Sequence, residues 1–237
     1  FLAAKTSGRQ MALDALARLS DSAPALPLRV LELVARDKAC EHPDKACHGE
    51  SCPLARGFYD RLPAARAAAV ATTMEGKNVP ALLQARVREV ALQHEVCPYY
   101  LSQELARWAD VVVGDYNYYF DLGGLLHGLA QANQWRTALL VDEAHNLVER
   151  GRKMFTAELH PAALAQARSS PTAAQHAPVK KALDKVRRAW VALDKAHPAP
   201  YTVLETFPDK LLAALQQCTT TLTEHFTDHP TEPDGAL

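Results

Sequence analysis

The stretch Leu139-Leu140-Val141-Asp142-Glu143-Ala144-His145 decides the fold, because an apolar run ends there in two adjacent carboxylates. The run Ala138–Val141 predicts a buried parallel strand that turns into a helix. Carboxylates at the carboxyl end of such a strand suit nucleotide hydrolysis. Asp142 can hold a Mg²⁺ ion, Glu143 can polarise the attacking water, and His145 can couple the site to the next element. The alternative is an acidic pair that caps a helix N-terminus.

Upstream of this motif, strand and helix patterns alternate, which is typical of an α/β fold. The strand patterns are Phe1–Ala4, Leu28–Val34 and Val111–Val113. The helical patterns are Ser7–Leu19, Pro53–Val70, a helix that starts at Asn78–Pro80, Pro98–Ala109 and Tyr116–Asn133. Gly123-Gly124 lies inside the last of these patterns and weakens it.

The pattern changes after Arg150. Three helical stretches follow, separated by prolines, and no convincing strand remains: Pro161–Ser169, Val179–Lys195 and Pro208–His225. We therefore expect a domain boundary near residue 155, followed by an all-helical segment.

The composition is that of an ordinary globular protein and excludes a wholly disordered or collagen-like chain. Of the 237 residues, 48% are hydrophobic and 22% charged, and the net charge is 26 − 27 = −1. This balance argues against a globally basic nucleic-acid binder but not against a local basic groove. No apolar stretch is long enough to cross a bilayer, and Phe1–Lys5 is not typical of a signal peptide, so we expect no membrane association. Because the chain starts at Phe1 and ends in a loop-like segment, we expect it to be a piece of a larger protein.

The cysteines form the second candidate site. An odd number of five argues against a disulfide framework. Cys40, Cys47, Cys52 and Cys97 are separated by six, four and forty-four residues. This spacing fits paired zinc knuckles poorly and suits a 4Fe–4S cluster, although a zinc site with His42 or His48, or unliganded thiols, remain alternatives. Cys218 belongs to a helical pattern and is expected to be a buried hydrophobe.

A third group of residues is suited to bind nucleic acid. Tyr116, Asn117 and Tyr118 follow a strand, where tyrosine rings can stack on bases and the amide can reach a phosphate or a base edge. Thr6 can contact a phosphate, and Arg56, close in sequence to Cys52, can do the same. The alternatives are that Tyr118, with Tyr119 and Phe120, packs the core and that Thr6 only caps a helix.

Taken together, these motifs resemble the XPD/DinG-like iron–sulfur helicases of superfamily 2. The resemblance covers residues 1 to about 155. Four segments carry it, in the order of that family: Phe1–Thr6, the four cysteines with Cys97-Pro98-Tyr99-Tyr100, Val112–Tyr118 and Asp142–His145.

The resemblance implies a RecA-like motor domain, in part, at residues 1–35 and 108–155. It implies an inserted, mainly helical iron–sulfur domain at 36–107 and part of a helical arch domain at 156–237. Cys40, Cys47, Cys52 and Cys97 would hold the 4Fe–4S cluster, and Asp142 and Glu143 would belong to the second ATPase motif.

The same resemblance implies an ATP- and Mg²⁺-dependent DNA helicase that moves 5′ to 3′ on single-stranded DNA in repair or replication, in a prokaryotic cytoplasm. The chain contains no Gly-x-x-x-x-Gly-Lys-Ser/Thr phosphate loop. We therefore expect the chain alone neither to hydrolyse ATP nor to unwind DNA. The alternative from another class is a non-enzymatic, zinc-stabilised module that binds DNA or a protein.

Overall fold

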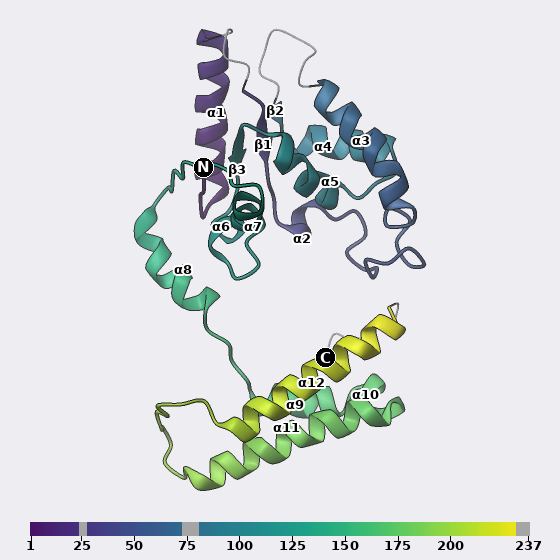
Figure 1. Ribbon diagram of the computed structural model, residues 1–237, viewed down its shortest axis with the longest axis vertical. Helices are drawn as coiled ribbons and strands as arrows, with labels where there is room; N and C mark the ends of the chain where they lie inside the picture. Colours follow the sequence, from purple (N-terminus) through teal and green to yellow (C-terminus); the bar gives the residue numbers. More distant parts are fainter. Residues whose placement is uncertain (24–27, 73–80, 231–237) are drawn as a thin grey trace. The chain divides into compact units, whose positions relative to one another are not determined.

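The computed structural model describes residues 1–23, 28–72 and 81–230. The chain divides into two compact units, Phe1–Ala157 (unit 1) and Glu158–Leu237 (unit 2) (Figure 1). Among the described residues, no helix is both long and apolar enough to cross a membrane.

Unit 1 is built on a small parallel sheet. Its strands are β1 (Val30–Glu32), β2 (Ala81–Leu82) and β3 (Val111–Val113), in the order β2-β1-β3 (Figure 1). Both pairs are parallel, which confirms the predicted α/β class and the strands expected around β1 and β3. Strand β2 was not predicted, and the helix start expected at Asn78–Pro80 lies outside the described residues.

Alternating residues of β1 supply the two faces of the sheet. Val30 packs with Val113 against α1 (Thr6–Ser22), which contributes Ala12 and Leu13. The next residue, Leu31, faces the opposite side and joins the core formed with the helices that follow. One strand of three residues therefore joins two separate apolar clusters, and in Figure 1 α1 lies on the other side of the sheet from α3, α4 and α5.

Two expected strands are reduced to isolated bridges. Leu2 bridges Gly114 on one side and Val141 on the other, both in parallel orientation. The prediction of a buried strand at Ala138–Val141 is wrong, since Leu140 is 65% exposed. The physical reason is that, among the described residues, this segment pairs with Leu2 alone, whereas a buried strand needs neighbours on both edges and cover on both faces.

The described residues of unit 1 form eight α-helices besides the sheet, with 3₁₀ turns at Ala106–Trp108 and Ala144–Asn146. Besides α1 they are α2 (Arg36–Ala39), α3 (Phe58–Thr72), α4 (Gln84–Gln93), α5 (Pro98–Leu105), α6 (Asn117–Phe120), α7 (Leu125–Ala132) and α8 (Leu147–Met154). The single helix expected over Tyr116–Asn133 is wrong, because the chain turns between α6 and α7. At that turn an ideal Cβ on Gly124 would lie 2.7 Å from the carbonyl oxygen of Tyr119, so glycine permits the close approach.

The segment 36–107 shares its core with the sheet. Leu31 and Leu33, at and just after β1, lie in one cluster with residues of α3, α4 and α5 and with Leu129 of α7. The same segment also supplies β2 to the sheet. The predicted insertion is therefore packed into the motor-like part through apolar contacts and a strand pairing.

Unit 2 is all helical in its described part. It contains α9 (Pro161–Arg168), α10 (Pro171–Gln175), α11 (Ala177–Ala196) and α12 (Asp209–Asp228). Its core combines leucines and valines with several alanines, which let the helices approach closely: Leu164, Ala167, Ala173, Val179, Ala182, Leu183, Val186, Leu211, Ala214 and Cys218. The burial of Cys218 is as expected from its helical pattern.

Ser170 is the N-cap of α10, and its hydroxyl accepts a hydrogen bond from the backbone N–H of Ala173 at 3.1 Å. Since Ser170 is buried, Ser170→Ala should cost about 1 kcal/mol. Amide hydrogen exchange in α10 and α11 should then accelerate about fivefold. Ser169→Ala is the control, because the exposed Ser169 hydroxyl only donates to the carbonyl of Ala165 in its own helix. Equal exchange rates in the two variants would contradict the capping role.

Candidate functional site

The acidic pair lies where the chain leaves its bridge with Leu2. The backbone N–H of Asp142 donates to the carbonyl of Leu2 at 2.9 Å, and the N–H of Leu2 donates to Leu140 at 2.8 Å. The Asp142 carboxylate lies directly against Gly8 in the first turn of α1, where any Cβ would collide with it. A glycine is therefore required there for the carboxylate to reach the start of the helix.

Glu143 has a left-handed backbone, with φ 50° and ψ 45°. This conformation costs a non-glycine residue on the order of 1–3 kcal/mol and is concentrated at functional sites. It is held by the N–H of Asn146, which donates to the Glu143 carbonyl at 2.9 Å. The turn leaves the Glu143 carboxylate exposed, 3.2 Å from His145 Nδ1. The structure thus brings Asp142, Glu143 and His145 together at one end of the bridged segment, with a carboxylate open to a ligand.

Tyr116 connects this turn to the loop after β3. Its ring is fully buried, and its hydroxyl donates to the backbone carbonyls of Asp142 and Glu143. Burial raises the pKa of Tyr116, and the nearby Asp142 adds to the rise. The Arg150 guanidinium lies 5.1 Å from the centre of the ring and bonds Asp115 at 2.9 Å. A ring in this position has no free face for a base, so the structure does not support the base-stacking role suggested for Tyr116 and gives it a structural one.

A groove of about 450 Å³ contains three of the other predicted nucleic-acid contacts of unit 1. Its walls come from the start of α1, α2, α5 and the loop after β3: Ala4, Thr6, Arg9, Ala35, Arg36, Lys38, Tyr99, Gln103, Asp115, Asn117, Tyr118, Asp121, Gly123 and Leu125. Thr6, Asn117 and Tyr118 are therefore brought together. The Tyr118 hydroxyl donates to the Val34 carbonyl at 2.7 Å, and burial raises its pKa.

Arg9 is a groove residue that the sequence analysis missed. It is only 7% exposed, and its guanidinium donates to Thr6 Oγ1 at 3.3 Å and to the Leu33 carbonyl at 3.5 Å. Within the described residues its Nε has no hydrogen-bond partner, and no carboxylate pairs with it. The available signal was its position three residues after Thr6 on the same helix face. Arg36 and Lys38, both exposed, add positive charge to the groove.

The four cysteines come from two segments. Cys40 ends α2 and Cys97 precedes α5, and both are half-buried; Cys47 is exposed and Cys52 buried. All four are free thiols. Burial raises the pKa of Cys97, its own helix amides oppose the rise, and the neighbouring Cys40 and Cys47 add to it. Arg36 Nη2 donates to the Cys47 sulfur at 2.9 Å. Cys40 and Cys47 therefore lie close enough to Cys97 to affect its pKa.

The separation of these sulfurs bears on the metal they can hold. In the described part of the chain, no three of them lie within 4.8 Å of one another. A tetrahedral zinc with Zn–S bonds of about 2.3 Å needs sulfurs about 3.8 Å apart. A cubane cluster places iron and sulfide between its cysteines and so spreads them more widely. Four thiols from two segments are a donor set that an iron–sulfur cluster can use.

Arg56 lies apart from the groove. It is exposed, and its Nε donates to the carbonyl of Gly49 at 3.1 Å, while its own carbonyl accepts from Arg61. These bonds tie together the loop that carries Cys47 and Cys52. Arg56 is therefore placed to order the cysteine loop, and its predicted contact with DNA stays a prediction.

Comparison with known proteins agrees with the motifs. Residues 9–164, more than half of the chain, match the DEAD_2 family. A regulator of telomere elongation helicase 1 homolog from Anopheles gambiae is 29% identical over 152 residues, covering 59% of this chain and 14% of that protein. The regulator of telomere elongation helicase 1 from Bos taurus is 28% identical over 140 residues, covering 56% and 11%. The XPD subunit of the general transcription and DNA repair factor IIH helicase from Dictyostelium discoideum is 32% identical over 63 residues, covering 26% and 8%.

The chain spans at most 14% of the length of these three relatives. The family match begins in α1 and ends in α9, so it contains the cysteines, the loop after β3 and the acidic pair. On this evidence the chain belongs to the DEAD_2 family and represents part of an XPD-like helicase of superfamily 2.

Proposed function

We propose that the chain is part of an ATP-dependent helicase that moves 5′ to 3′ on single-stranded DNA, in repair or replication. The observation that carries this proposal is the buried Arg9 guanidinium in the wall of the groove, which forms no ion pair with a carboxylate of the described residues. A buried charge without a counter-charge costs folding free energy, and an anionic ligand in the groove removes that cost. The backbone of a nucleic acid is such a ligand.

The groove offers the types of contact that a moving protein needs. Arg9, Arg36 and Lys38 attract phosphates, and Thr6 and Asn117 can bond their oxygens. Two carboxylates, Asp115 and Asp121, line the same groove, and Asp115 is paired with Arg150. Phosphate contacts carry no sequence information, so such a groove holds every sequence alike. This property suits translocation along a strand.

The acidic pair is proposed to act on ATP bound together with a phosphate loop that this chain does not contain. Asp142, next to the start of α1, would hold Mg²⁺ through water. Glu143, exposed on its left-handed turn, would orient and polarise the water that attacks the γ-phosphate. His145, 3.2 Å from the Glu143 carboxylate, would orient that carboxylate.

Cys40, Cys47, Cys52 and Cys97 are proposed to hold a 4Fe–4S cluster. Between α2 and α3 only Cys52 is buried, and the structure has neither helix nor strand there. A segment with so little buried apolar surface needs another source of order, and a metal centre supplies it, as in small metal-dependent domains. The prokaryotic cytoplasm stays a prediction from the sequence.

Cys47→Ser should lose iron and loosen residues 40–57, because the loop then depends on its few hydrogen bonds. The measurements are iron content, the brown colour of the anaerobically purified protein, and limited proteolysis. The sheet around Val113 should stay protected. Cys218→Ser, in the other unit, is the control and should keep its iron. Zinc instead of iron in the wild-type protein would favour the alternative, a zinc-stabilised binding module.

Glu143→Gln in the longer protein should lower ATP turnover at least about 100-fold while ATP binding is kept, because the amide cannot polarise water but the phosphate loop still binds. Glu149→Gln is the matched control, since Glu149 is an exposed carboxylate on α8 that pairs only with Arg152. Steady-state hydrolysis and nucleotide-binding titrations separate the two effects. Normal hydrolysis by the first variant would remove Glu143 from the active site.

Arg9→Met in the longer protein should weaken binding of single-stranded DNA equally for all sequences. The slope of log affinity against log salt should fall by about 0.7, the value for one phosphate contact. Thermal stability should be kept or raised, because the variant removes a buried, uncompensated charge.

Arg29→Met is the control for this experiment. Arg29 is paired with Asp110 at 3.0 Å and lies outside the groove, so its loss should leave the salt slope unchanged. Arg56→Ala, measured in parallel, tests whether the cysteine loop also contacts the strand. A sequence-selective loss with Arg9→Met, or an unchanged slope, would contradict the groove as a phosphate site.

A further inference from the structure

Three histidines meet at one end of unit 2. His176 lies between α10 and α11, His225 lies in the last turn of α12, and His229 is the C-cap of α12. One ring nitrogen from each lies within 4.8 Å of the others, and the ring centres are 4.4, 4.5 and 5.0 Å apart. His225 is 8% exposed and the other two are half-buried. Three histidines from two separate parts of the sequence thus lie close enough together to bind one metal ion.

The hydrogen bonding of His229 orients it for this purpose. Its Nδ1 lies 3.0 Å from the backbone carbonyl of His225. A carbonyl oxygen only accepts, so Nδ1 must carry the proton and Nε2 keeps its lone pair. This arrangement, with one ring nitrogen bonded to a backbone carbonyl, is the usual support of a metal-ligating histidine. The spacing of His225 and His229, one helical turn apart, places both on the same face.

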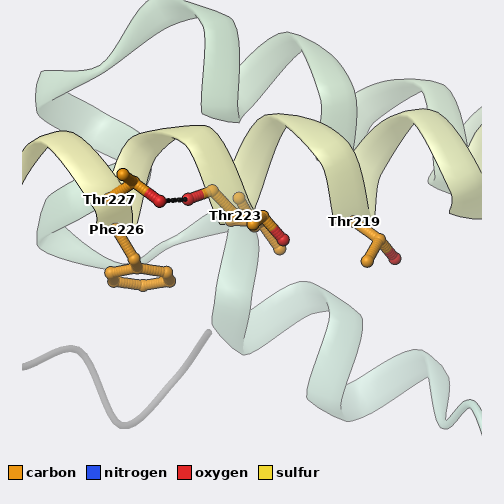
Figure 2. Close-up of a pocket in the computed structure, with 5 residues that line it drawn as sticks. Thr219, Thr223, Phe226 and Thr227 are labelled. Carbon is orange, nitrogen blue, oxygen red and sulfur yellow. Dashed lines mark hydrogen bonds between the residues drawn. The ribbon is translucent and has the colours of Figure 1, made fainter.

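The end of α12 has few apolar contacts, since beyond Cys218 its described contribution to the apolar core is the partly buried Leu222. Its second half is rich in threonine, a residue of low helix propensity: Thr219, Thr220, Thr221, Thr223 and Thr227. Several of these hydroxyls bond back to the helix's own carbonyls, as Thr227 does to Thr223 at 2.7 Å (Figure 2). The buried apolar residues of this helix end at Cys218, before the last turns. Only His225 is buried beyond that point.

The outer face of the same turns does not offer an anchor. There Thr219, Leu222, Thr223, Phe226 and Thr227 line a shallow hollow, and in Figure 2 the labelled side chains lie along one side of α12. The metal-ligating groups therefore lie on the packed side of α12 and the hydroxyls on its outer side. Small helical units with a limited apolar core commonly use a metal as an additional cross-link.

We propose that His176, His225 and His229 bind one Zn²⁺ ion, with water in the fourth position, and that the ion fastens the end of α12 to the α10–α11 junction. Imidazole nitrogens suit zinc, and three histidines with one open position are an established zinc environment. The site is distinct from the four cysteines, because it lies in the other unit. It is also independent of the proposed helicase activity.

The test is zinc binding by the 237-residue chain and its variants, measured by isothermal titration and by metal content after dialysis. His229→Gln and His176→Gln should each bind one Zn²⁺ fewer per chain than the wild type. Zinc or iron bound at the cysteines is the same in every variant and so cancels from the comparison. His229→Cys should retain the ion, since a thiolate is also a good zinc ligand.

His197→Gln is the matched control. His197 is the C-cap of α11, with φ −130° and ψ 72°, nearly the backbone of His229 at φ −128° and ψ 63°, and it lies outside the cluster. It should bind zinc as the wild type does. Zinc at about 100 times its dissociation constant should raise the Tm of unit 2 by on the order of 10 °C in the wild type and in His197→Gln but not in His229→Gln.

The test relies on variants of His176 and His229, which are partly exposed. It therefore does not require a variant of the buried His225, which could fail to fold. Equal zinc content in the wild type and in His229→Gln would overturn the proposal. The proposal would also fail if His197→Gln lost as much zinc as His229→Gln, because the loss would then be unspecific.

Discussion

Four backbone hydrogen bonds of the first three residues hold the candidate site of unit 1 together. Leu2 donates to Leu140 and accepts from Asp142, while Ala3 donates to Gly114 and Phe1 accepts from it, at 2.8 to 3.1 Å. This short piece therefore lies between the loop after β3 and the acidic turn. It also leads directly into α1, whose first turn contacts the Asp142 carboxylate. This pairing therefore gives the acidic pair, the loop and the helix a common backbone frame.

The loop after β3 belongs to both halves of the site. Tyr116 points to the acidic turn and bonds its carbonyls, whereas Asn117 and Tyr118 line the groove. Asp115 fixes the loop to α8 through Arg150, whose guanidinium also covers the Tyr116 ring. A displacement of the acidic turn must therefore change the packing of Tyr116, and the next two residues form part of the groove. If the acidic turn binds nucleotide and the groove binds a strand, as proposed, this contiguous set of contacts links the two.

The sequence predicted the elements that local pattern determines and missed those that depend on distant neighbours. The apolar run Val111–Val113 and the helix after Thr6 are confirmed as β3 and α1. The strand expected at Ala138–Val141 failed, because burial depends on neighbours that a run of four residues does not encode. The left-handed turn at Glu143 likewise cannot be predicted from an Asp-Glu pair.

The candidate sites show the same division between local pattern and distant neighbours. The cysteines and the acidic pair could be identified because their residue types and spacing carry the chemistry. Arg9 could not, since its importance lies in being buried without a carboxylate. The histidine cluster was readable in part, because two of its members are one helical turn apart, but only the fold brings the third to them.

The charge of unit 1 is best understood from where each arginine lies rather than from the total. The net charge of −1 gives the whole chain no general attraction for a polyanion. Arg29, Arg88 and Arg150 are each held by a carboxylate, and a paired guanidinium offers little to a phosphate. Arg9 is instead held by burial and by hydrogen bonds to two uncharged oxygens, the Leu33 carbonyl and Thr6 Oγ1. These bonds fix its position without neutralising its charge. A buried guanidinium without a counter-charge lowers the stability of the free protein, and a bound phosphate would restore that stability. Because the Arg9 side chain is already in place, little side-chain entropy would be lost on binding of the proposed strand, so a nearly neutral net charge is compatible with a phosphate site in this groove.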